Sequence, residues 1–450
     1  MEIRQIIIAP ESDGIELLAA TTLQDYCRRI GHRDVPVTRL GTSAGDVEDG
    51  TVLIGNPSTH PSIQALIEQR RLPDPLSTLK PEGFVLATVA INHAEALVIT
   101  GRDGKGILNG VYDLLQDTFH VGFMRDGTRL PDHADLTVND LNVIESPRHS
   151  IRGELLWGYP GPQRYCSSTW PLEIWQRIID WQAQKKMNTI ELDLPLGLIL
   201  PVAFPELTWQ WGGPWDAEFT RDHVCAILDY GRSRGIRFMY EVWYSKMSDT
   251  LRQAYPDLLW HDHFLCASQP ECAAFSRKVW HAAFELFGTD HLYTIRYRGE
   301  EGMPYSPACK EISKWQGYLQ AFNLLREVDP AARISAWSWA EAPEELWPHF
   351  PHDFECQHMK HQLHGEWRFP GLGRFIEPGR PPIPEGRPWY NANFLVFSGT
   401  ETKLLNNLSD PVHLIDDARL SADDPACDGY MIWPEWTNTG YYLWDLMSEL

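Results

Sequence analysis

The sequence predicts an α/β protein in which a small N-terminal α/β sandwich domain precedes a (β/α)8 TIM barrel. The chain has 450 residues, whereas single domains mostly have roughly 100 to 250. Strand-like and helix-like segments alternate over residues 1–145, and a second alternation with eight strand-like segments covers residues 146–450. We place the domain boundary in the segment IESPRHS, where Pro147 interrupts regular structure.

The N-terminal domain is predicted from short apolar runs separated by amphipathic helices. The strand-like segments are 4–9, 51–55, 83–90 and 96–101, and the helix-like segments are 15–30, 60–71 and 106–119. Such an alternation is typical of layered α/β domains. The intervening sequence TGRDGKG lacks the Walker spacing of a phosphate loop, so we predict that it forms the turn before the last helix.

The barrel is predicted from a regular series of strand-like segments with helix-like segments between several of them. The strand-like segments are 150–158, 189–195, 236–244, 292–299, 333–339, 353–359, 389–397 and 429–435. In a TIM barrel the reactive groups occupy the C-terminal ends of the strands and the loops that follow. The long Gly- and Pro-rich segment 364–388 is therefore predicted to be an active-site loop.

Composition excludes several function classes. The formal charge is −22 and the pI about 5.2, which opposes binding to a phosphate backbone, so no nucleic-acid partner is expected. The N-terminal apolar run is too short for a secretory signal, and no stretch of about 20 apolar residues could span a membrane. We predict a soluble, cytoplasmic protein whose eight scattered cysteines are reduced thiols.

A metal or cofactor is not predicted. No zinc-like spacing of cysteine and histidine is visible, and the histidines between 349 and 364 lack regular ligand spacing. A carbohydrate ligand is favoured instead by the 19 tryptophans, nearly all of which follow residue 150. The flat C–H faces of pyranose rings pack on aromatic rings, although barrel cores and helix faces also use tryptophan.

Two glutamates that follow strand-like runs form the candidate catalytic pair. Glu300 lies in FGTDHLYTIRYRGEE and Glu435 lies in WPEW. Cleavage of a glycosidic bond needs one acid to protonate the leaving oxygen and a second carboxylate to attack or stabilise the sugar cation. A carboxyl group near aromatic rings and a second carboxylate has a raised pKa. Glu300 is therefore the candidate general acid, and Glu435 the candidate nucleophile.

Both glutamates also have simpler structural interpretations. Glu300 could form an ion pair with Arg296 or Arg298, which lie on the same face if the strand extends that far. Glu435 could instead complement the dipole of a helix that follows it. The two arginines could pair with internal acids such as Glu241, or they could bind the carboxylate of an acidic sugar.

The other residues at the predicted strand ends suit a polyhydroxylated ligand. Carboxylates and amides exchange hydrogen bonds with hydroxyl groups, while tryptophan faces hold the ring. The candidate substrate-binding residues are Trp157, Tyr159, Glu241, Trp243, Arg298, Trp337, Trp339, His358, Asn393, Trp433 and Trp436.

The chain resembles the α-N-acetylglucosaminidases of glycoside hydrolase family 89. The resemblance is in FGTDHLY before Glu300, in LREVDPAARISAWSW, and in GYMIWPEWTNTGYYLWDLMSEL around Glu435. Residues 1–145 are similar to the small domain ahead of the barrels of families 20, 67 and 89. The resemblance implies a retaining mechanism, with Glu300 as acid/base and Glu435 as nucleophile, acting on an α-linked sugar of an oligosaccharide or glycoside.

Two departures from family 89 shape the alternatives. Arg298 and Gly299 precede Glu300 where the family usually has Phe-Asn, which removes an amide near the sugar 2-position. The family's large C-terminal helical domain is missing, so a homo-oligomer could close the cleft. The alternatives are an α-glucuronidase-like hydrolase that uses Arg296 and Arg298, and a catalytically inactive carbohydrate-binding protein.

Overall fold

The structure is a computed structural model of the chain. It describes residues 1–12, 14–40, 47–156, 170–212, 216–261, 263–295, 312–337, 347–360, 368–369, 373–374, 386–395, 419 and 421–434. The chain divides into two compact units. The first contains Met1–Ser150, Gln176–Asn188 and Tyr230–Ile236, and the second contains Ile151–Trp175, Thr189–Asp229 and Arg237–Leu450.

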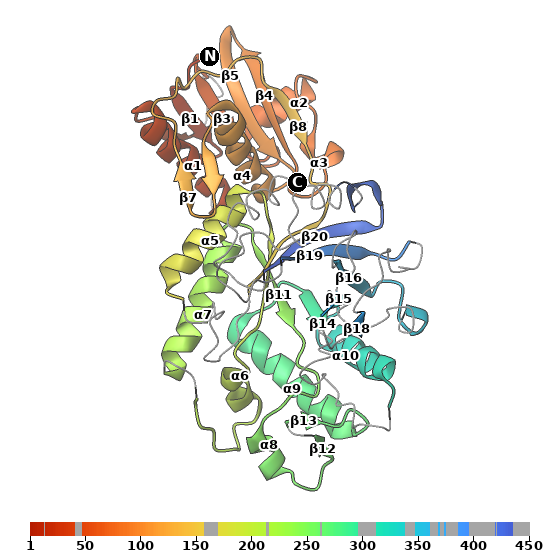
Figure 1. The fold of residues 1–450 in the computed structure, drawn as a ribbon. Coiled ribbons are helices and arrows are strands. Elements are labelled where there is room, and N and C mark those ends of the chain that lie inside the picture. Colours follow the sequence, from red (N-terminus) through yellow and green to blue (C-terminus); the bar gives the residue numbers. More distant parts are fainter. Residues whose placement is uncertain are drawn as a thin grey trace. The chain divides into compact units, whose positions relative to one another are not determined.

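The first unit is built on a six-stranded mixed sheet (Figure 1). In spatial order its strands are β2 (Val37–Arg39), β1 (Gln5–Ile8), β3 (Thr51–Ile54), β5 (Ala94–Gly101), β4 (Phe84–Ile91) and β8 (Asn142–Glu145). The four strands from β2 to β5 are parallel, and β4 runs antiparallel to both β5 and β8. A separate hairpin pairs β6 (Gly122–Met124) with β7 (Gly127–Arg129).

Helices cover the sheet of the first unit. They are α1 (Gly14–Gly31), α2 (Pro61–Glu68), α3 (Pro75–Thr78) and α4 (Gly104–Asp113), which continues into a π-helical turn at Leu114–Thr118. Ile63 of α2 packs with Leu53 and Val98 of the sheet in one core cluster. Asp103 caps α4 by accepting a hydrogen bond from the Gly106 amide, so the sequence TGRDGKG forms the predicted turn before a helix.

Two segments from the barrel half of the sequence belong to the first unit. Lys186 forms ion pairs with Asp113 and Glu145, and the Asn188 side chain donates a hydrogen bond to Glu82 at 2.6 Å. The first unit therefore extends beyond residues 1–145.

The second unit contains a closed barrel of eight parallel strands (Figure 1). They are β9 (Ile151–Leu156), β10 (Thr189–Leu192), β11 (Arg237–Glu241), β14 (Leu292–Ile295), β15 (Arg333–Trp337), β16 (Glu355–Lys360), β19 (Trp389–Leu395) and β20 (Cys427–Pro434). Pairing of β20 with β9 closes the ring. Each predicted strand-like segment of the barrel overlaps one of these strands, and the predicted fold class is confirmed.

Helices follow the earlier strands of the barrel. They are α5 (Leu172–Gln184), α6 (Leu196–Ala203), α7 (Ala217–Arg232), α8 (Asp249–Ala254), α9 (Pro270–Phe287) and α10 (Lys314–Val328). Two short antiparallel pairs also occur, β12 (Trp260–His261) with β13 (Phe264–Leu265) and β17 (Arg368–Phe369) with β18 (Gly373–Arg374).

The segment that leads into β16 packs along α10 through aromatic pairs. A 3-10 turn (Trp347–His349) places His349 against Trp315, with ring centroids 4.1 Å apart. Further along, Phe350 contacts Tyr318 and Phe354 contacts Phe322. These contacts fix the chain before β16 against a neighbouring helix.

One part of the barrel interior is filled by apolar side chains from strands on opposite sides of the ring. Ile151, Leu155, Met239, Leu292, Tyr390, Ala392 and Met431 form one buried cluster. The close approach of β9 to β10 requires a glycine, because a Cβ at Gly153 would lie 1.7 Å from the Thr189 carbonyl oxygen.

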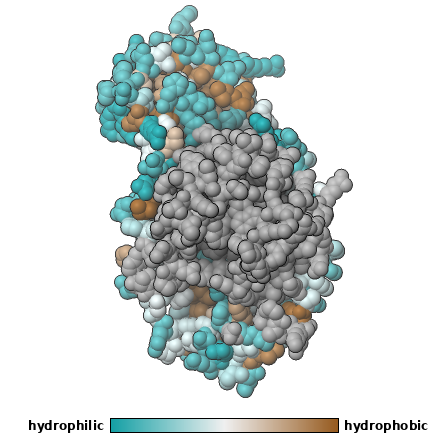
Figure 2. Space-filling model, in the orientation of Figure 1, coloured by the Kyte–Doolittle hydropathy of each residue, from teal (hydrophilic) through white to brown (hydrophobic). Residues whose placement is uncertain are grey.

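The surface and the cysteines add two observations. Figure 2 shows hydrophilic residues over most of the coloured surface, with hydrophobic residues in small groups. Within the described ranges, no helix combines the length and apolar character needed to cross a membrane. Cys266 is disulfide-bonded, so the prediction of reduced thiols is wrong at this position.

Candidate active site

The candidate active site lies at the C-terminal ends of the barrel strands, where TIM barrels place their reactive groups. In the ring, β14 and β20 are separated by three strands on each side, so they are diametrically opposed. Glu300 follows the last residue of β14 by five positions, and Glu435 comes directly after Pro434, which ends β20. The sequence therefore attaches the two candidate catalytic glutamates to opposite strands at the same end of the barrel.

Several predicted site residues lie outside the part of the chain that the structure describes. They are Glu300, Glu435, Trp157, Tyr159, Arg296, Arg298, Trp339 and Trp436. Their roles stay predictions.

Four predicted substrate-binding residues belong to barrel strands. Trp337 ends β15 and is paired with Gln357. His358 is the fourth residue of β16 and is paired with Asn391. Asn393 of β19 is paired with Ile432.

Trp433 is the last residue but one of β20, and it is paired with Phe394. The backbone thus brings Trp433 and Trp337 to the C-terminal ends of their strands. His358 and Asn393 lie within strands, each two residues before the last.

Acidic residues occupy the interior of the barrel near its C-terminal end. Glu241 ends β11, is half-buried and is paired with Thr294. Glu191, in the predicted strand-like segment 189–195, is fully buried and stands in register between Leu155 and Met239, which both face the interior. The alternation of Glu191 with Asp193 in TIELDLP is the sequence signal that assigns it to this end of the strand.

Trp243 occupies a different environment from the one predicted. It is 4% exposed and stacks on Trp280 of α9, with ring centroids 5.1 Å apart and ring planes 19° apart. Trp280 itself is fully buried. One face of the Trp243 ring is therefore used in packing against a helix, and the structure places this side chain in the core. Glu241, the last residue of β11, faces the barrel interior, but Trp243, two residues later, already points away from the interior and toward α9.

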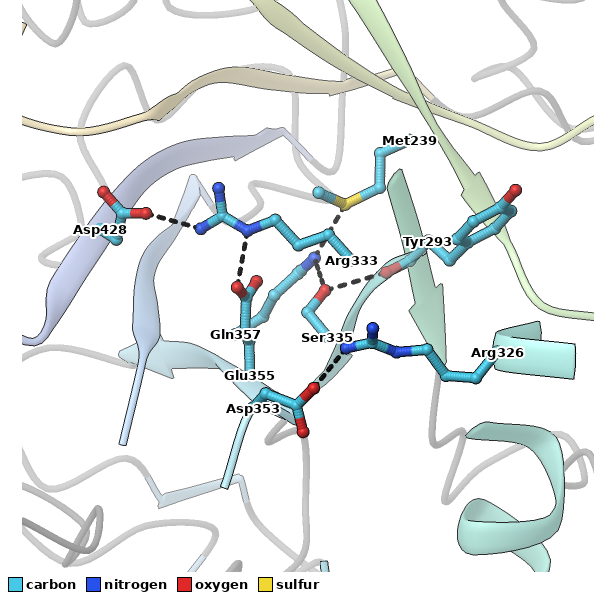
Figure 3. Close-up of polar contacts among 9 residues, drawn as sticks. All are labelled: Met239, Tyr293, Arg326, Arg333, Ser335, Asp353, Glu355, Gln357 and Asp428. Atoms are coloured by element: carbon cyan, nitrogen blue, oxygen red, sulfur yellow. Dashed lines mark hydrogen bonds and ion pairs between the residues drawn. The ribbon is translucent and has the colours of Figure 1, made fainter. Parts of the chain in front are cut away.

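The N-terminal half of the barrel interior holds a polar network (Figure 3). Arg333 of β15 donates from Nε to Glu355 of β16 at 2.6 Å and from Nη2 to Asp428 of β20 at 2.7 Å. Nearby, the Gln357 amide donates to Ser335 Oγ at 2.8 Å. Glu355 and Arg333 begin their strands, so this network lies at the end of the barrel opposite to the candidate active site.

Glu355 gives the barrel a specific pH dependence. Burial raises the pKa of Glu355 from 4.5 to about 7, and the neighbouring Arg333 offsets only part of this effect. The folded state therefore binds a proton at Glu355 more tightly than the unfolded state does. The protonated Glu355 stabilises the folded state at low pH, and this contribution to the free energy of unfolding is lost as the pH rises from about 4.5 to about 7. Asp428 and Asp353 act in the same direction as burial.

We expect Glu355→Gln to remove this dependence. The free energy of unfolding of the wild type, minus that of the variant, should fall by a few kcal/mol at most between pH 4.5 and 7, since one pKa unit corresponds to about 1.4 kcal/mol. Urea titrations at pH 4.5, 6 and 7.5 would measure this difference. A difference that stays constant, or rises, across these pH values would contradict the assignment.

No metal site is found in the described part of the chain, where no group of three or more His, Cys, Asp or Glu side chains is positioned to hold an ion. The interior acids are distributed over separate strands instead. Individual carboxylates and strand-end aromatic residues therefore occupy the C-terminal end of the barrel. Carboxylates in such a setting can exchange hydrogen bonds and transfer protons.

Comparison with known proteins gives a family match for part of the chain. Residues 2–114 match the model of the glycosyl hydrolase family 67 N-terminus. Comparison with curated protein sequences gave no match.

Solved structures share the fold across the whole chain. A family 89 glycoside hydrolase from Clostridium perfringens, in complex with 2-acetamido-1,2-dideoxynojirmycin, has a TM-score of 0.63 and 13% identity, covering 98% of this chain and 49% of that one. A GH138 enzyme targeting pectin rhamnogalacturonan II has a TM-score of 0.60 and 13% identity, with coverages of 99% and 50%. A GH115 4-O-methyl-α-glucuronidase has a TM-score of 0.57 and 14% identity, with coverages of 100% and 56%.

These likenesses show the fold. The chain spans 44 to 50% of the length of the first four structures it matches. Since glycoside hydrolases of several families appear among them, the comparisons do not single out family 89. The chain thus has the architecture that these glycoside hydrolases share, with an N-terminal domain that matches the family 67 model.

Proposed function

We propose that this protein is a retaining glycoside hydrolase that cleaves an α-linked, α-N-acetylglucosaminide-like sugar from oligosaccharides or glycosides. The observation that carries the proposal is the attachment of Glu300 and Glu435 to opposite strands, β14 and β20, at the C-terminal end of one closed barrel. Two carboxyl groups that approach a sugar from opposite sides of a barrel can act on both sides of one glycosidic bond.

The mechanism assigns a different task to each glutamate. Glu300 protonates the glycosidic oxygen as the bond to the anomeric carbon breaks, while the Glu435 carboxylate attacks that carbon to form a glycosyl ester. Glu300, now ionised, removes a proton from water, which attacks the anomeric carbon and releases Glu435. Two inversions give net retention, and this mechanism requires the carboxyl groups to lie about 5 to 5.5 Å apart.

The described residues support a sugar ligand at this end of the barrel. Glu241 ends β11 inside the ring, and Trp337 and Trp433 stand at or next to the ends of β15 and β20. Together with the family 67 N-terminal match and the fold shared with several glycoside hydrolases, they favour a glycosidase over an unrelated barrel enzyme.

An α-glucuronidase-like activity is the second candidate. Its support is the fold shared with a GH115 4-O-methyl-α-glucuronidase, together with Arg296 and Arg298, which follow β14 in the sequence. Guanidinium groups bind carboxylates through paired hydrogen bonds. In that case turnover of an α-glucuronide should exceed turnover of the α-N-acetylglucosaminide, and Arg298→Met should remove the preference.

A panel of nitrophenyl glycosides of both anomers tests the proposal. We expect release of nitrophenol from an α-glycoside, with the first sugar product in the α configuration by NMR. Turnover of β-glycosides alone, or a β product, would contradict it. Saturable sugar binding without any hydrolysis, unchanged by Glu435→Gln, would favour the inactive carbohydrate-binding protein.

Glu300→Gln should reduce activity in a way that depends on the leaving group. General acid catalysis contributes roughly 10² to 10⁴ in rate, but a nitrophenolate leaves without a proton. We therefore expect a loss of this size on an alkyl or sugar glycoside and a much smaller loss on the dinitrophenyl glycoside of the same sugar. Equal losses on both substrates would indicate damage to the structure instead of a lost acid.

A further inference from the structure

Strand β20 contains one extra residue near its start. Trp389 of β19 is paired with Cys427, but the next residue, Tyr390, is paired with Gly429. Asp428 is therefore the inserted residue of a β-bulge. Because side chains alternate between the two faces of a strand, one inserted residue moves every later side chain to the opposite face.

The bulge decides which residues of β20 face the barrel interior. Met431 is fully buried in the interior cluster with Leu155 and Met239. Gly429 lies against the Tyr390 ring, where a Cβ would come within 2.4 Å of a ring carbon. The odd-numbered residues 429 and 431 therefore face inward. Without the bulge, the even-numbered residues of β20 would take these positions.

Arg333 holds the bulge by its inserted residue. The Asp428 carboxylate accepts a hydrogen bond from Arg333 Nη2 at 2.7 Å, and Arg333 Nε donates to Glu355 at 2.6 Å (Figure 3). The same guanidinium lies 5.3 Å from the centroid of the Tyr390 ring, the residue at which the register shifts. One side chain thus contacts both sides of the irregularity.

Glu435 follows β20 directly in the sequence. We propose that Arg333 and Asp428 are positioning residues: they fix the bulge that sets which residues of β20 face the barrel interior, and with it the register of the strand that leads to Glu435. The inference rests on the proposed role of Glu435 as nucleophile.

Kinetics of Asp428→Ala test the inference on the nitrophenyl glycoside that the wild type hydrolyses. Small displacements of a reacting group can reduce rates by up to about 10²-fold. We expect kcat to fall by about tenfold or more and KM to change by a smaller factor, because most of the candidate substrate-binding residues belong to other strands. Asp428→Asn keeps an oxygen acceptor for Arg333 and should retain most of kcat.

Asp353→Ala is the matched control. Asp353 also pairs with an arginine, Arg326 of α10, but this pair lies outside the barrel and its aspartate side chain is 61% exposed (Figure 3). The control should leave kcat within about twofold of the wild type, as expected for an exposed pair. Equal effects of the two alanine variants, or unchanged kcat in Asp428→Ala, would overturn the inference. If Asp428→Ala does not fold, Asp428→Ser, whose side chain is too short to reach Arg333, takes its place and is compared with Asp353→Ser, with the same difference expected.

A second readout separates this inference from the proposed function. If the wild type hydrolyses none of the glycosides, the proposed function fails. The positioning role is then tested by the rate at which a charged methanethiosulfonate labels the thiol of Glu435→Cys. We expect labelling above the wild-type background, and a several-fold slower rate once Asp428→Ala is added at matched far-UV circular dichroism. Equal labelling rates with and without Asp428→Ala would refute the positioning role.

Discussion

Glu435→Ala should abolish turnover of every glycoside that the wild-type protein hydrolyses. In the proposed mechanism this carboxylate forms the covalent bond to the anomeric carbon, so its loss removes the first chemical step instead of weakening it. Removing a catalytic nucleophile from a hydrolase can reduce kcat by about 10⁶-fold. We therefore expect activity below detection for the alkyl glycosides and a small residual rate for dinitrophenyl glycosides.

Azide distinguishes a missing nucleophile from a damaged protein. Azide can enter the space left by the carboxylate and attack the anomeric carbon directly, giving a glycosyl azide of inverted configuration. We expect the rate of Glu435→Ala on an activated aryl glycoside to rise with azide concentration, and the product to be the inverted glycosyl azide by NMR. Absence of rescue in a folded variant would argue against a nucleophilic role.

Glu327→Ala provides the matched control for Glu435→Ala. Glu327 of α10 is exposed and pairs with Arg277 of α9, with bonds of 2.8 and 2.9 Å. Surface ion pairs contribute little to stability, so this variant should keep full activity and show no response to azide. A similar loss in both variants would point to a general effect of removing a glutamate.

The fold was predictable because its main signals are local. Alternating apolar runs such as TIELDLP and RISAW identify strands wherever one face must be buried, and each of the eight segments overlaps a barrel strand. The chain before β16 was different. Its packing depends on contacts of Phe350 and Phe354 with α10, which are distant in sequence and leave no periodic signal.

The candidate site was predictable only at the level of strand ends. Trp337 and Trp433 could be assigned to strand ends because alternation locates the strand itself. Trp243 could not, since its stacking on Trp280 depends on where the chain turns after β11. The bulge at Asp428 was equally invisible in the sequence, because one inserted residue changes the facing of a strand without changing its composition.

The extent of the first unit also had no sequence signal. Lys186 and Asn188 lie between α5 and β10, and nothing in their neighbourhood distinguishes them from other polar residues after a helix. Their hydrogen bonds to Asp113 and Glu82 join residues 73 and 106 positions apart. Composition and periodicity describe neighbours along the chain, so contacts over such separations require coordinates.

Arg387→Met should cause a large loss of stability in the barrel unit. Arg387 is 4% exposed, and its Nη1 donates to the carbonyl oxygens of Pro351 and Phe354 at 2.7 and 2.9 Å. Nη2 makes longer bonds, of 3.4 and 3.3 Å, to the carbonyl oxygens of Trp347 and Phe350. This guanidinium thus satisfies the backbone of the segment that packs along α10.

The two short bonds set the size of the effect. Hydrogen bonds from a charged donor contribute about 1.5 to 3 kcal/mol each, and buried carbonyls left without a donor cost about 1 to 3 kcal/mol. Methionine keeps most of the apolar volume but supplies no donor. We therefore expect the free energy of unfolding to fall by roughly 3 to 5 kcal/mol. Urea unfolding followed by tryptophan fluorescence would measure the loss.

Arg326→Met is the control that isolates burial as the cause. Arg326 undergoes the same substitution, also lies over an aromatic ring, and pairs with Asp353 just before β16, but both side chains are substantially exposed. An exposed pair of this kind contributes at most about 1 kcal/mol. A difference of several kcal/mol between the two variants is expected, because only Arg387 leaves buried carbonyl groups without a donor. If Arg326→Met destabilises the protein as much as Arg387→Met, the segment before β16 is held by its aromatic contacts and not by the guanidinium.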